Sequence, residues 1–476
     1  MRPVQAIKFT QDQDVAINQL LEFINKPFSK SDYKIALTGA AGTGKTFSLK
    51  YVIDNCGYSH SVIGLSAPTH KACRVLKEST SLDVKTIQSD LGLRLTLDVD
   101  NFDINNPPFD PRGKIKIGDY RVYIVDEASM INNGLRTLIE REAIKHNVKL
   151  IYTGDPYQLA PVKETYSSCF RNIKTVNLNQ IVRQGENNPL SPLLEMLRHD
   201  IRTKQYSFIN YIYSNRYNID VVSDKGYALL TKEQFENNIQ MQFSNEEFTK
   251  NVDLYKVVGY TNASVNNWNK FIRSSIIADA ERNIITKNDL ITSYTTIVDD
   301  YNSPIIKNSE EYIIRDIVNY VNATYDLKGF MVKFTCIHGG DTTAPLFILD
   351  HNDKQSLIRY YQIINNLIDS AKRATKSGRA AAWKTYYAFK DAVLLATNIV
   401  NNVTGEIIIS RDIDYGFSLT SHKSQGSTYS NVFVDINDIV YDKNGSPYVN
   451  VEEVNRRLYV AVSRAKNKAF FRYGKY

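Results

Sequence analysis

The sequence is poor in the features that cross-link a chain or hold it in a membrane. Its 476 residues include only four cysteines, none at CxxC spacing or in a cluster with histidine, which argues against a disulfide framework or a zinc site. We expect these four, Cys56, Cys73, Cys169 and Cys336, to be free thiols in a reducing compartment. No apolar run approaches ~18 residues, and the polar N-terminus lacks a signal-peptide core. A cytoplasmic enzyme with no membrane partner is the resulting expectation.

An excess of charge of one sign is also missing. The formal net charge is +7, and the 43% hydrophobic and 23% charged residues are ordinary for a globular protein. This balance permits a polyanionic partner without requiring one. At about 150 residues per domain the length suggests roughly three domains, and we find no internal repeat or low-complexity tract.

A glycine-rich loop lies between an apolar strand and a helix in the stretch "YKIALTGAAGTGKTFSLKYVI". It matches the phosphate-binding pattern GxxxxGK[ST], whose backbone N–H groups and helix N-terminus face phosphate oxygens. Lys45 is expected to neutralise the β- and γ-phosphates of ATP, and the Thr46 hydroxyl to ligate Mg²⁺. The predicted phosphate cradle comprises Gly39, Ala40, Ala41, Gly42, Thr43, Gly44, Lys45 and Thr46.

An acidic pair, Asp126-Glu127, ends the apolar strand Val122 to Val125 about 80 residues after the loop. The carboxyl end of a strand is where parallel α/β sheets place their ligands. Asp126 is expected to hold Mg²⁺ through water, and Glu127 to orient or deprotonate the attacking water.

Three further polar residues follow apolar segments. Gln158, in "GDPYQLAPV", has an amide that can sense a γ-phosphate. Arg183, in "NQIVRQ", and Arg464, in "VAVSRAK", are candidate arginine fingers, which stabilise charge on a transferring phosphoryl group. Because the two arginines lie in different halves of the chain, an ATP site between two domains is expected.

The ordered set "FTQDQ", "GAAGTGKT", "APTHKA", "TIQSDL", "VDEASM", "GDPYQLAPV", "NQIVRQ", "SLTSHKSQGSTYSNVFV" and "LYVAVSRAK" resembles the motifs of superfamily 1 helicases. The resemblance is greatest to the RecD-like branch, and within it to the Dda-type phage DNA helicases. It implies that Gln13 reads the adenine edge, that Gln158 couples the γ-phosphate to movement, and that Gly426 lies beside the γ-phosphate. It also implies 5′-to-3′ movement on single-stranded DNA and a phage origin, with work in the host cytoplasm during DNA replication or recombination. Single-strand-binding or other replication proteins are further expected partners.

Polar residues at predicted strand ends offer contacts to a DNA backbone. They occur in two matching groups, one in each half of the chain, which suits a strand that crosses two motor domains. The candidates are Pro68, Thr69, His70, Thr86 and Ser89 in the first half, and Thr261, Asn262, His422, Ser424 and Thr428 in the second. For any one of them an ordinary cap or turn role is an equal alternative.

Two insertions interrupt the motor pattern. Alternating residues in 91–118 predict a β-hairpin, either a surface decoration or a pin that splits a duplex, with Phe102 or Phe109 stacking on the last base pair. Residues 305–404 predict short strands, similar to the SH3-like barrel of the resembling helicases, followed by two antiparallel helices. The aromatic residues of these helices favour helix packing over base stacking.

The predicted fold is therefore α/β, with two RecA-like P-loop motor domains made of parallel sheets flanked by helices. Motor domain 1 is expected in 1–90 and 119–185, and motor domain 2 in 186–304 and 405–476, with a β-hairpin insertion in the first and an SH3-like barrel plus helical arm in the second. The predicted function is an ATP- and Mg²⁺-dependent DNA helicase that acts as a monomer on single-stranded and forked DNA. The alternatives are a translocase that strips proteins from DNA or acts on RNA, a P-loop enzyme of another class, and a non-catalytic ATP-gated module.

Overall fold

The structure is a computed structural model, and it describes residues 9–95, 109–111, 114–161, 164–180, 188–298, 304–375, 377–401, 404 and 406–474. The chain divides into two compact units. Unit 1 comprises 1–93, 111–265 and 419–476, and unit 2 comprises 94–110 and 266–418. Unit 1 contains two six-stranded sheets, and unit 2 contains a five-stranded antiparallel sheet.

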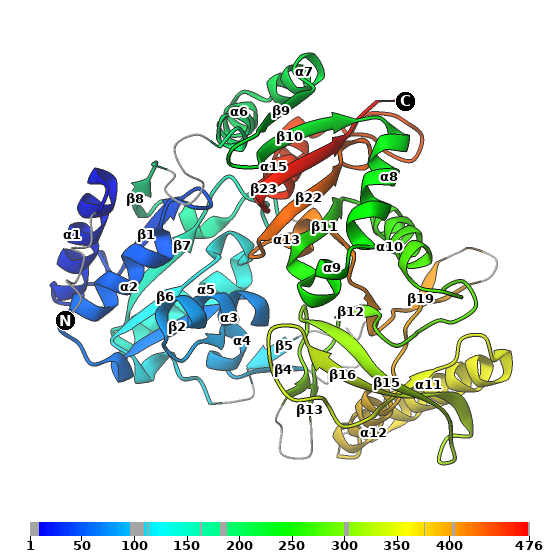
Figure 1. The fold of residues 1–476 in the computed structure, drawn as a ribbon. Coiled ribbons are helices and arrows are strands. Elements are labelled where there is room, and N and C mark those ends of the chain that lie inside the picture. The colour runs from blue at the N-terminus through cyan, green and yellow to red at the C-terminus, as the bar shows by residue number, and fades with distance from the viewer. Residues whose placement is uncertain are drawn as a thin grey trace, which may run out of the picture. The chain divides into compact units, whose positions relative to one another are not determined.

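The first sheet of unit 1 is wholly parallel, with the strand order β3-β2-β6-β7-β1-β8 (Figure 1). Its strands are β1 (Lys34–Gly39), β2 (Ile63–Ala67), β3 (Lys85–Thr86), β6 (Val122–Val125), β7 (Lys149–Gly154) and β8 (Lys174–Leu178). The helices of this domain are α1 (Gln11–Asn25), α2 (Lys45–Asn55), α3 (His70–Thr80), α4 (Ile87–Asp90) and α5 (Asn133–His146), with short 3₁₀ turns at η1 (His60–Val62), η2 (Ile117–Asp119), η3 (Ala128–Met130) and η4 (Ser168–Phe170).

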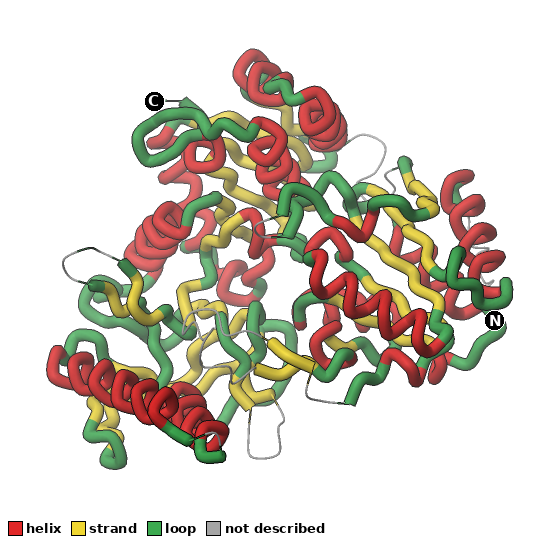
Figure 2. Tube along the Cα trace, turned by 180° about the vertical axis from the view of Figure 1, so that it is seen from behind, coloured by secondary structure: helices red, strands yellow, loops and turns green. Residues whose placement is uncertain are grey.

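Both faces of this sheet are buried, which explains why its strands read as continuous apolar runs. Successive residues of β1 alternate between two cores: Ile35 and Leu37 pack with residues of α1 and α2, whereas Ala36 packs with residues of α5. Figure 2 shows these strands in yellow with red helices on both sides. The burial holds the carboxyl ends of β1, β6 and β7 at one edge of the sheet, where the glycine loop and the acidic pair begin.

The second sheet of unit 1 has the order β21-β11-β22-β23-β10-β9. The pairs β11–β22, β22–β23 and β10–β23 are parallel, and the edge strand β9 is antiparallel to β10. Its strands are β9 (Tyr217–Asp220), β10 (Lys225–Leu230), β11 (Tyr255–Gly259), β21 (Ser418–Thr420), β22 (Tyr429–Asp435) and β23 (Ala465–Arg472). The helices of this part are α6 (Leu190–Thr203), α7 (Ser207–Ser214), α8 (Lys232–Phe243), α9 (Glu246–Lys250), η5 (Val252–Leu254), α13 (Ser421–Ser424), α14 (Ile436–Val440) and α15 (Val451–Ser463). Helix α10 (Asn262–Ile276) begins in unit 1 and continues into unit 2. The predicted α/β architecture with two parallel motor sheets is confirmed.

The antiparallel sheet has the order β17-β16-β15-β12-β20. Its strands are β12 (Leu290–Ser293), β15 (Glu311–Asn322), β16 (Leu327–Cys336), β17 (Leu346–Leu349) and β20 (Ile413–Tyr415), with two small ribbons, β13 (Ile297–Val298) with β14 (Pro304–Ile306) and β18 (Ile399–Val400) with β19 (Ile407–Ile409). Strands β12 and β20 lie outside the expected limits 305–404, so the sheet of this insertion extends beyond them at both ends. Long-range pairing of these short strands leaves no local trace in the sequence.

The predicted pair of helices follows the sheet as α11 (Lys354–Arg373) and α12 (Arg379–Ala392). The side chains of Tyr360, Trp383, Tyr386 and Phe389 are all buried in one core between them and the sheet. Helix packing therefore accounts for these aromatic residues. In the first insertion, β4 (Leu93–Leu95) pairs with β5 (Phe109–Pro111), and the predicted tip, including Phe102, lies outside the described residues.

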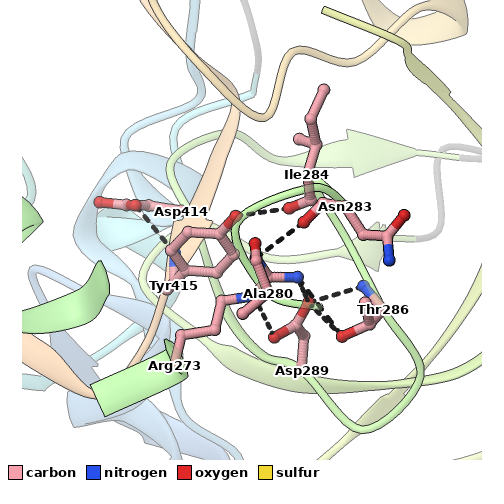
Figure 3. A network of polar contacts seen from close by, with 8 residues as sticks. All are labelled: Arg273, Ala280, Asn283, Ile284, Thr286, Asp289, Asp414 and Tyr415. Carbon is pink, nitrogen blue, oxygen red and sulfur yellow. Dashed lines mark hydrogen bonds and ion pairs between the residues drawn. The ribbon is translucent and has the colours of Figure 1, made fainter. Parts of the chain in front are cut away.

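A buried ion pair anchors the segment that leads from α10 into β12 (Figure 3). Arg273 donates from Nε to Asp289 Oδ1 at 2.7 Å and from Nη2 to Asp289 Oδ2 at 2.9 Å. Its Nη1 donates to the carbonyl oxygens of Ala280 and Asn283 at 2.5 and 2.8 Å, and its guanidinium lies 4.7 Å from the ring centre of Tyr415. The guanidinium of Arg273 on α10 thus contacts the loop at Ala280 and Asn283, the carboxylate of Asp289 and the ring of Tyr415 on β20.

None of the helices in the described part of the chain combines the length and apolar character that a bilayer span requires.

Candidate active site

The glycine loop between β1 and α2 has the backbone that its sequence requires. Gly42 and Gly44 have φ values of +85° and +86°, in the left-handed region that favours glycine. At Gly39 an added Cβ would lie 2.6 Å from Thr43 Oγ1 and 2.8 Å from the carbonyl oxygen of Leu178. The Lys45 ammonium donates to the carbonyl oxygens of Gly39 and Ala40 at 2.8 and 3.0 Å, so the cation lies against the loop that it is expected to serve.

Gln13 lies beside this loop, on the first turn of α1. Its Nε2 donates to the carbonyl oxygen of Thr43 at 3.1 Å, and its Oε1 accepts from the backbone N–H of Thr10 at 3.1 Å. Both ends of the amide are therefore in use within the protein. The adenine contact of Gln13 stays a prediction.

Asp126 and Glu127 follow β6 and face the same edge of the sheet. Glu127 has a left-handed backbone, with φ of +50°, which is rare for a residue other than glycine and common at functional turns. Its Oε2 is buried and has no hydrogen-bond partner among the residues that the structure describes. A buried carboxylate oxygen without a partner fits a site that receives water or a cation.

Burial and nearby cations have opposite effects on the pKa values of Asp126 and Glu127. Burial, and then the negative charge of Asp126, raise the pKa of Glu127 to about 7, while Arg464 and Lys45 act in the opposite direction. Burial likewise raises the pKa of Asp126, opposed by Lys45. Two carboxylates that are poorly solvated beside Lys45, with the Thr46 hydroxyl at the start of α2, form a donor set of the kind that Mg²⁺ prefers.

The second motor domain brings Gly426 and Arg464 to the acidic pair. A Cβ added to Gly426 would lie 3.9 Å from Glu127 Oε1. Arg464 is buried, and its Nη1 donates to the carbonyl oxygen of Ser427 at 2.9 Å. Burial lowers the pKa of this guanidinium, and the charge of Glu127 opposes that shift. A cavity of about 30 Å³ is lined by Ala41 and Gly42 from the glycine loop and by Thr428 and Arg464 from the second domain.

Gln158 lies in the loop after β7, which the second domain also contacts. The Gln425 amide donates to Gln158 Oε1 at 3.4 Å and to the carbonyl oxygen of Leu159 at 3.3 Å. Arg456 donates to the carbonyl oxygens of Pro156 and Gln158 at 2.6 and 2.9 Å. The other predicted finger, Arg183, lies outside the described residues.

The first group of predicted DNA contacts gathers at the ends of β2 and β3. These strands pair in parallel, with Ala67 opposite Thr86, so the segments that follow them begin side by side. Thr69 caps α3 by accepting from the N–H of Ala72, and Thr86 caps α4 by accepting from the N–H of Ser89. The group comprises the predicted residues Pro68, Thr69, His70, Thr86 and Ser89, of which all but Ser89, which is exposed, are half-buried.

The second group is divided by the structure. Asn262 and His422 line a groove of about 710 Å³, together with Leu159 and Pro161 from the first domain. We call this cavity the strand groove. Its carboxylates are largely paired within the protein: Glu452 bonds to Arg456 at 3.1 Å, and Glu453 pairs with Arg457.

Three residues of that group, Thr261, Ser424 and Thr428, do not line the groove. Ser424 is fully buried and donates to the carbonyl oxygen of Ser421, and its DNA contact stays a prediction. Thr428 lines the small cavity at Ala41 and Gly42, on the nucleotide side. The Thr261 hydroxyl donates to Asp438 at 2.6 Å, which fixes the end of β11. Phe109 belongs to β5, and its side chain lies outside the description.

Sequence reasoning missed several residues that join the two motor domains. Tyr459 donates to Asp155 at 2.6 Å, Arg456 grips the loop after β7, and Lys71 lies 3.2 Å from the hydroxyl of Tyr429. Tyr260 lines the strand groove, with Arg457 lying 3.4 Å from its ring centre. The local signal was the position of Arg456 and Tyr459 on the helix that directly precedes Arg464. A helical pattern does not indicate a contact with a residue about 300 positions away in the chain.

The fold and the site together define a P-loop nucleotide-binding enzyme with two parallel motor sheets. A family model described as an AAA domain matches residues 11–211, and one described as a UvrD-like helicase C-terminal domain matches residues 415–471. An uncharacterized protein, R530, of Acanthamoeba polyphaga mimivirus is 23% identical, over 97% of this chain and 99% of its own length. The ATP-dependent DNA helicase dda of Enterobacteria phage T4 is 22% identical, over 97% of this chain and 98% of its own.

Among solved structures, Bacteroides Pif1 bound to single-stranded DNA has a similar fold, with a TM-score of 0.50 at 15% identity, over 98% of this chain and 92% of that one. These matches agree with the superfamily 1 helicase motifs found in the sequence, and the enzymatic class they support is ATP-dependent DNA helicase. The family expected from the sequence motifs is thereby confirmed.

Proposed function

We propose that this protein is a monomeric motor that moves 5′-to-3′ on single-stranded DNA and unwinds forked duplexes during phage DNA replication or recombination. One observation carries the proposal: the two motor domains jointly build both the nucleotide site and the strand groove. Glu127 of the first domain faces Gly426 and Arg464 of the second, and the groove is lined by Pro161 of the first domain and His422 of the second. A change in the fit between the domains must therefore alter both sites at once.

At the nucleotide site, each role follows from the position of a side chain. Lys45 exchanges the carbonyl oxygens of Gly39 and Ala40 for phosphate oxygens, to which its charge is better matched. Glu127, with a raised pKa and a free carboxylate oxygen, orients the water that attacks the γ-phosphorus and accepts its proton. Arg464, buried and held by Ser427, stabilises the charge that develops on the transferred group. Thr46 and Asp126 would hold Mg²⁺, which neutralises phosphate charge when bound.

The strand groove supports single-stranded DNA as the polymer. Asn262 and His422 offer polar contacts, and Tyr260 offers an aromatic face braced by Arg457. The Pif1 protein of similar fold was solved with single-stranded DNA bound, and the phage T4 relative is named as a DNA helicase. Because such contacts fix position without reading bases, we expect little sequence preference.

The insertions are assigned to handling of the fork. We propose that residues 91–118 form a pin that separates the strands, and that the antiparallel sheet with α11 and α12 corresponds to the SH3-like barrel and arm. The pairing of β4 with β5 supports a hairpin at the pin position. Deleting residues 101–111 should abolish unwinding and spare DNA-stimulated ATP hydrolysis. Unwinding that survives this deletion would exclude the pin and leave a plain translocase.

Strand displacement tests the main proposal. Duplexes with one single-stranded tail, either 5′ or 3′, are incubated with the full chain, ATP and Mg²⁺. The Lys45→Ala variant is the inactive control. We expect displacement from the 5′-tailed substrate alone, and none with the control. Displacement from the 3′ tail alone would overturn the polarity, and hydrolysis without any displacement would overturn unwinding.

A further inference from the structure

The loop after β7 belongs to the first motor sheet by sequence, but side chains of the second domain hold it in place. Tyr459, in the middle of α15, is fully buried, and its hydroxyl donates to Asp155 Oδ2 at 2.6 Å. The other carboxylate oxygen of Asp155 accepts from the backbone N–H of Tyr157 at 3.0 Å. The carboxylate therefore links the turn of its own loop to a helix of the other domain.

Two further contacts strengthen this attachment. Arg456 lies three residues before Tyr459 on the same face of α15, and it donates to the carbonyl oxygens of Pro156 and Gln158. The ring of Tyr157 packs against the core of the second domain, with the Arg198 guanidinium 4.7 Å from its centre. The loop is thus fixed to the second domain through a hydroxyl, a guanidinium and an aromatic ring.

Both ends of the attachment lead to functional residues. Towards the nucleotide, α15 ends at Ser463 and is followed directly by Arg464, while the loop carries Gln158. Towards the polymer, Leu159 and Pro161 line the strand groove. A rotation of α15 that moves Arg464 must therefore either carry the wall of the groove with it or break the bond between Tyr459 and Asp155.

The chemistry of that bond favours the first outcome. A hydrogen bond from a buried phenol to a buried carboxylate is of the strong, charge-assisted kind, and breaking it leaves one desolvated oxygen of that carboxylate without its donor. The groove wall and the finger are then expected to move as one body.

We propose that Tyr459 is a positioning residue that couples ATP hydrolysis to strand binding through its hydrogen bond with Asp155. This inference rests on the proposed function, because it requires a nucleotide site and a DNA-binding groove. Tyr459 lies in the interface between the motor domains, where its hydroxyl donates to Asp155. Loss of its hydroxyl should leave hydrolysis without DNA intact and remove the acceleration that DNA causes.

The test is steady-state ATP hydrolysis by the full-length Tyr459→Phe variant, with and without a saturating oligo-dT strand. We expect the rate without DNA to stay within about twofold of wild type, with an unchanged KM for ATP, and the DNA-stimulated kcat to fall about tenfold or more. Wild-type stimulation in the variant would overturn the inference. A parallel fall in both rates would also overturn it, since that result marks a structural or catalytic role.

Two variants control for nonspecific effects. Tyr441→Phe removes a hydroxyl that bonds to Tyr473 at 3.0 Å within the second domain, and it should leave both rates unchanged. Asp155→Asn, alone and combined with Tyr459→Phe, completes a double-mutant cycle in which the two losses of stimulation should be strongly non-additive. Additive losses would contradict the proposed link. If the wild-type enzyme itself shows no stimulation by DNA, the proposed function fails and the inference fails with it.

Discussion

The hydroxyl of Tyr459 and the carboxylate of Asp155 meet at 2.6 Å although 304 positions separate them in the chain. Five residues beyond Tyr459 on the same segment, Arg464 faces the acidic pair that ends β6. Helix α15 therefore contacts the loop after β7 through Tyr459 near its middle, and its C-terminal end places Arg464 at the nucleotide site. This geometry explains how an arginine near the C-terminus can serve a phosphate loop near the N-terminus.

Replacing Glu127 by Gln should stop turnover while ATP still binds. The amide is nearly isosteric with the carboxylate but cannot accept a proton from the attacking water. We expect kcat to fall by at least about 100-fold, with tight retention of labelled ATP on a filter. Brisk turnover in this variant would remove Glu127 from the reaction.

Replacing Arg464 by Ala should lower kcat by about 1,000-fold, because arginine fingers supply charge stabilisation of that order. Lysine at the same position should restore only part of the rate, since it keeps the charge but loses the planar fork that reaches Ser427. ATP hydrolysis with DNA present measures both, and Arg216→Ala, at an exposed position, is the matched control. A lysine variant as slow as the alanine variant would show that the geometry of the fork, and not its charge, is essential.

Replacing Arg273 by Met should destabilise unit 2 by about 3–5 kcal/mol, because it leaves the buried Asp289 without its cation. Urea unfolding followed by fluorescence measures the loss. Arg282→Met removes an exposed ion pair with Asp279 and should change the free energy of unfolding by no more than about 1 kcal/mol. Equal effects of the two substitutions would contradict a structural role for the buried pair.

Acid should destabilise the fold through His351, which follows β17 and contacts the hydroxyl of Thr397. Burial lowers the pKa of His351 from 6.5 to about 4, so the unfolded chain takes up the proton first. Stability is complete above pH 6.5 and is lost as the pH falls towards 4, by about 2 kcal/mol at pH 5. The free energy of unfolding of His351→Gln, measured at pH 7.5 and pH 5, should lack this component. The same loss in both proteins would assign it to other groups.

Local patterns predicted the residues whose roles depend on their own strand or turn. The glycine loop can be recognised in the sequence because its backbone conformation requires glycine at Gly42 and Gly44. The acidic pair can be recognised because it directly follows an apolar strand. The antiparallel insertion was placed too narrowly, since β12 and β20 are short strands whose pairing with the rest is long-range. Ser424 was predicted to contact DNA because short polar side chains in such motifs suit phosphate contacts, and the structure adds that its hydroxyl donates to the carbonyl oxygen of Ser421.

The amino-acid sequence by itself determined the chemistry of the protein: the order of its motifs specified a P-loop, an acidic pair and a late arginine, because backbone strain and strand periodicity are local. Only the tertiary structure decided which of these residues meet. The approach of Glu127 to Arg464 and Gly426, and of Asp155 to Tyr459, depends on how helices of the second sheet pack against loops of the first. Such contacts form when segments that are far apart in the chain pack together and are buried. They leave no periodic pattern in the sequence from which they could be predicted.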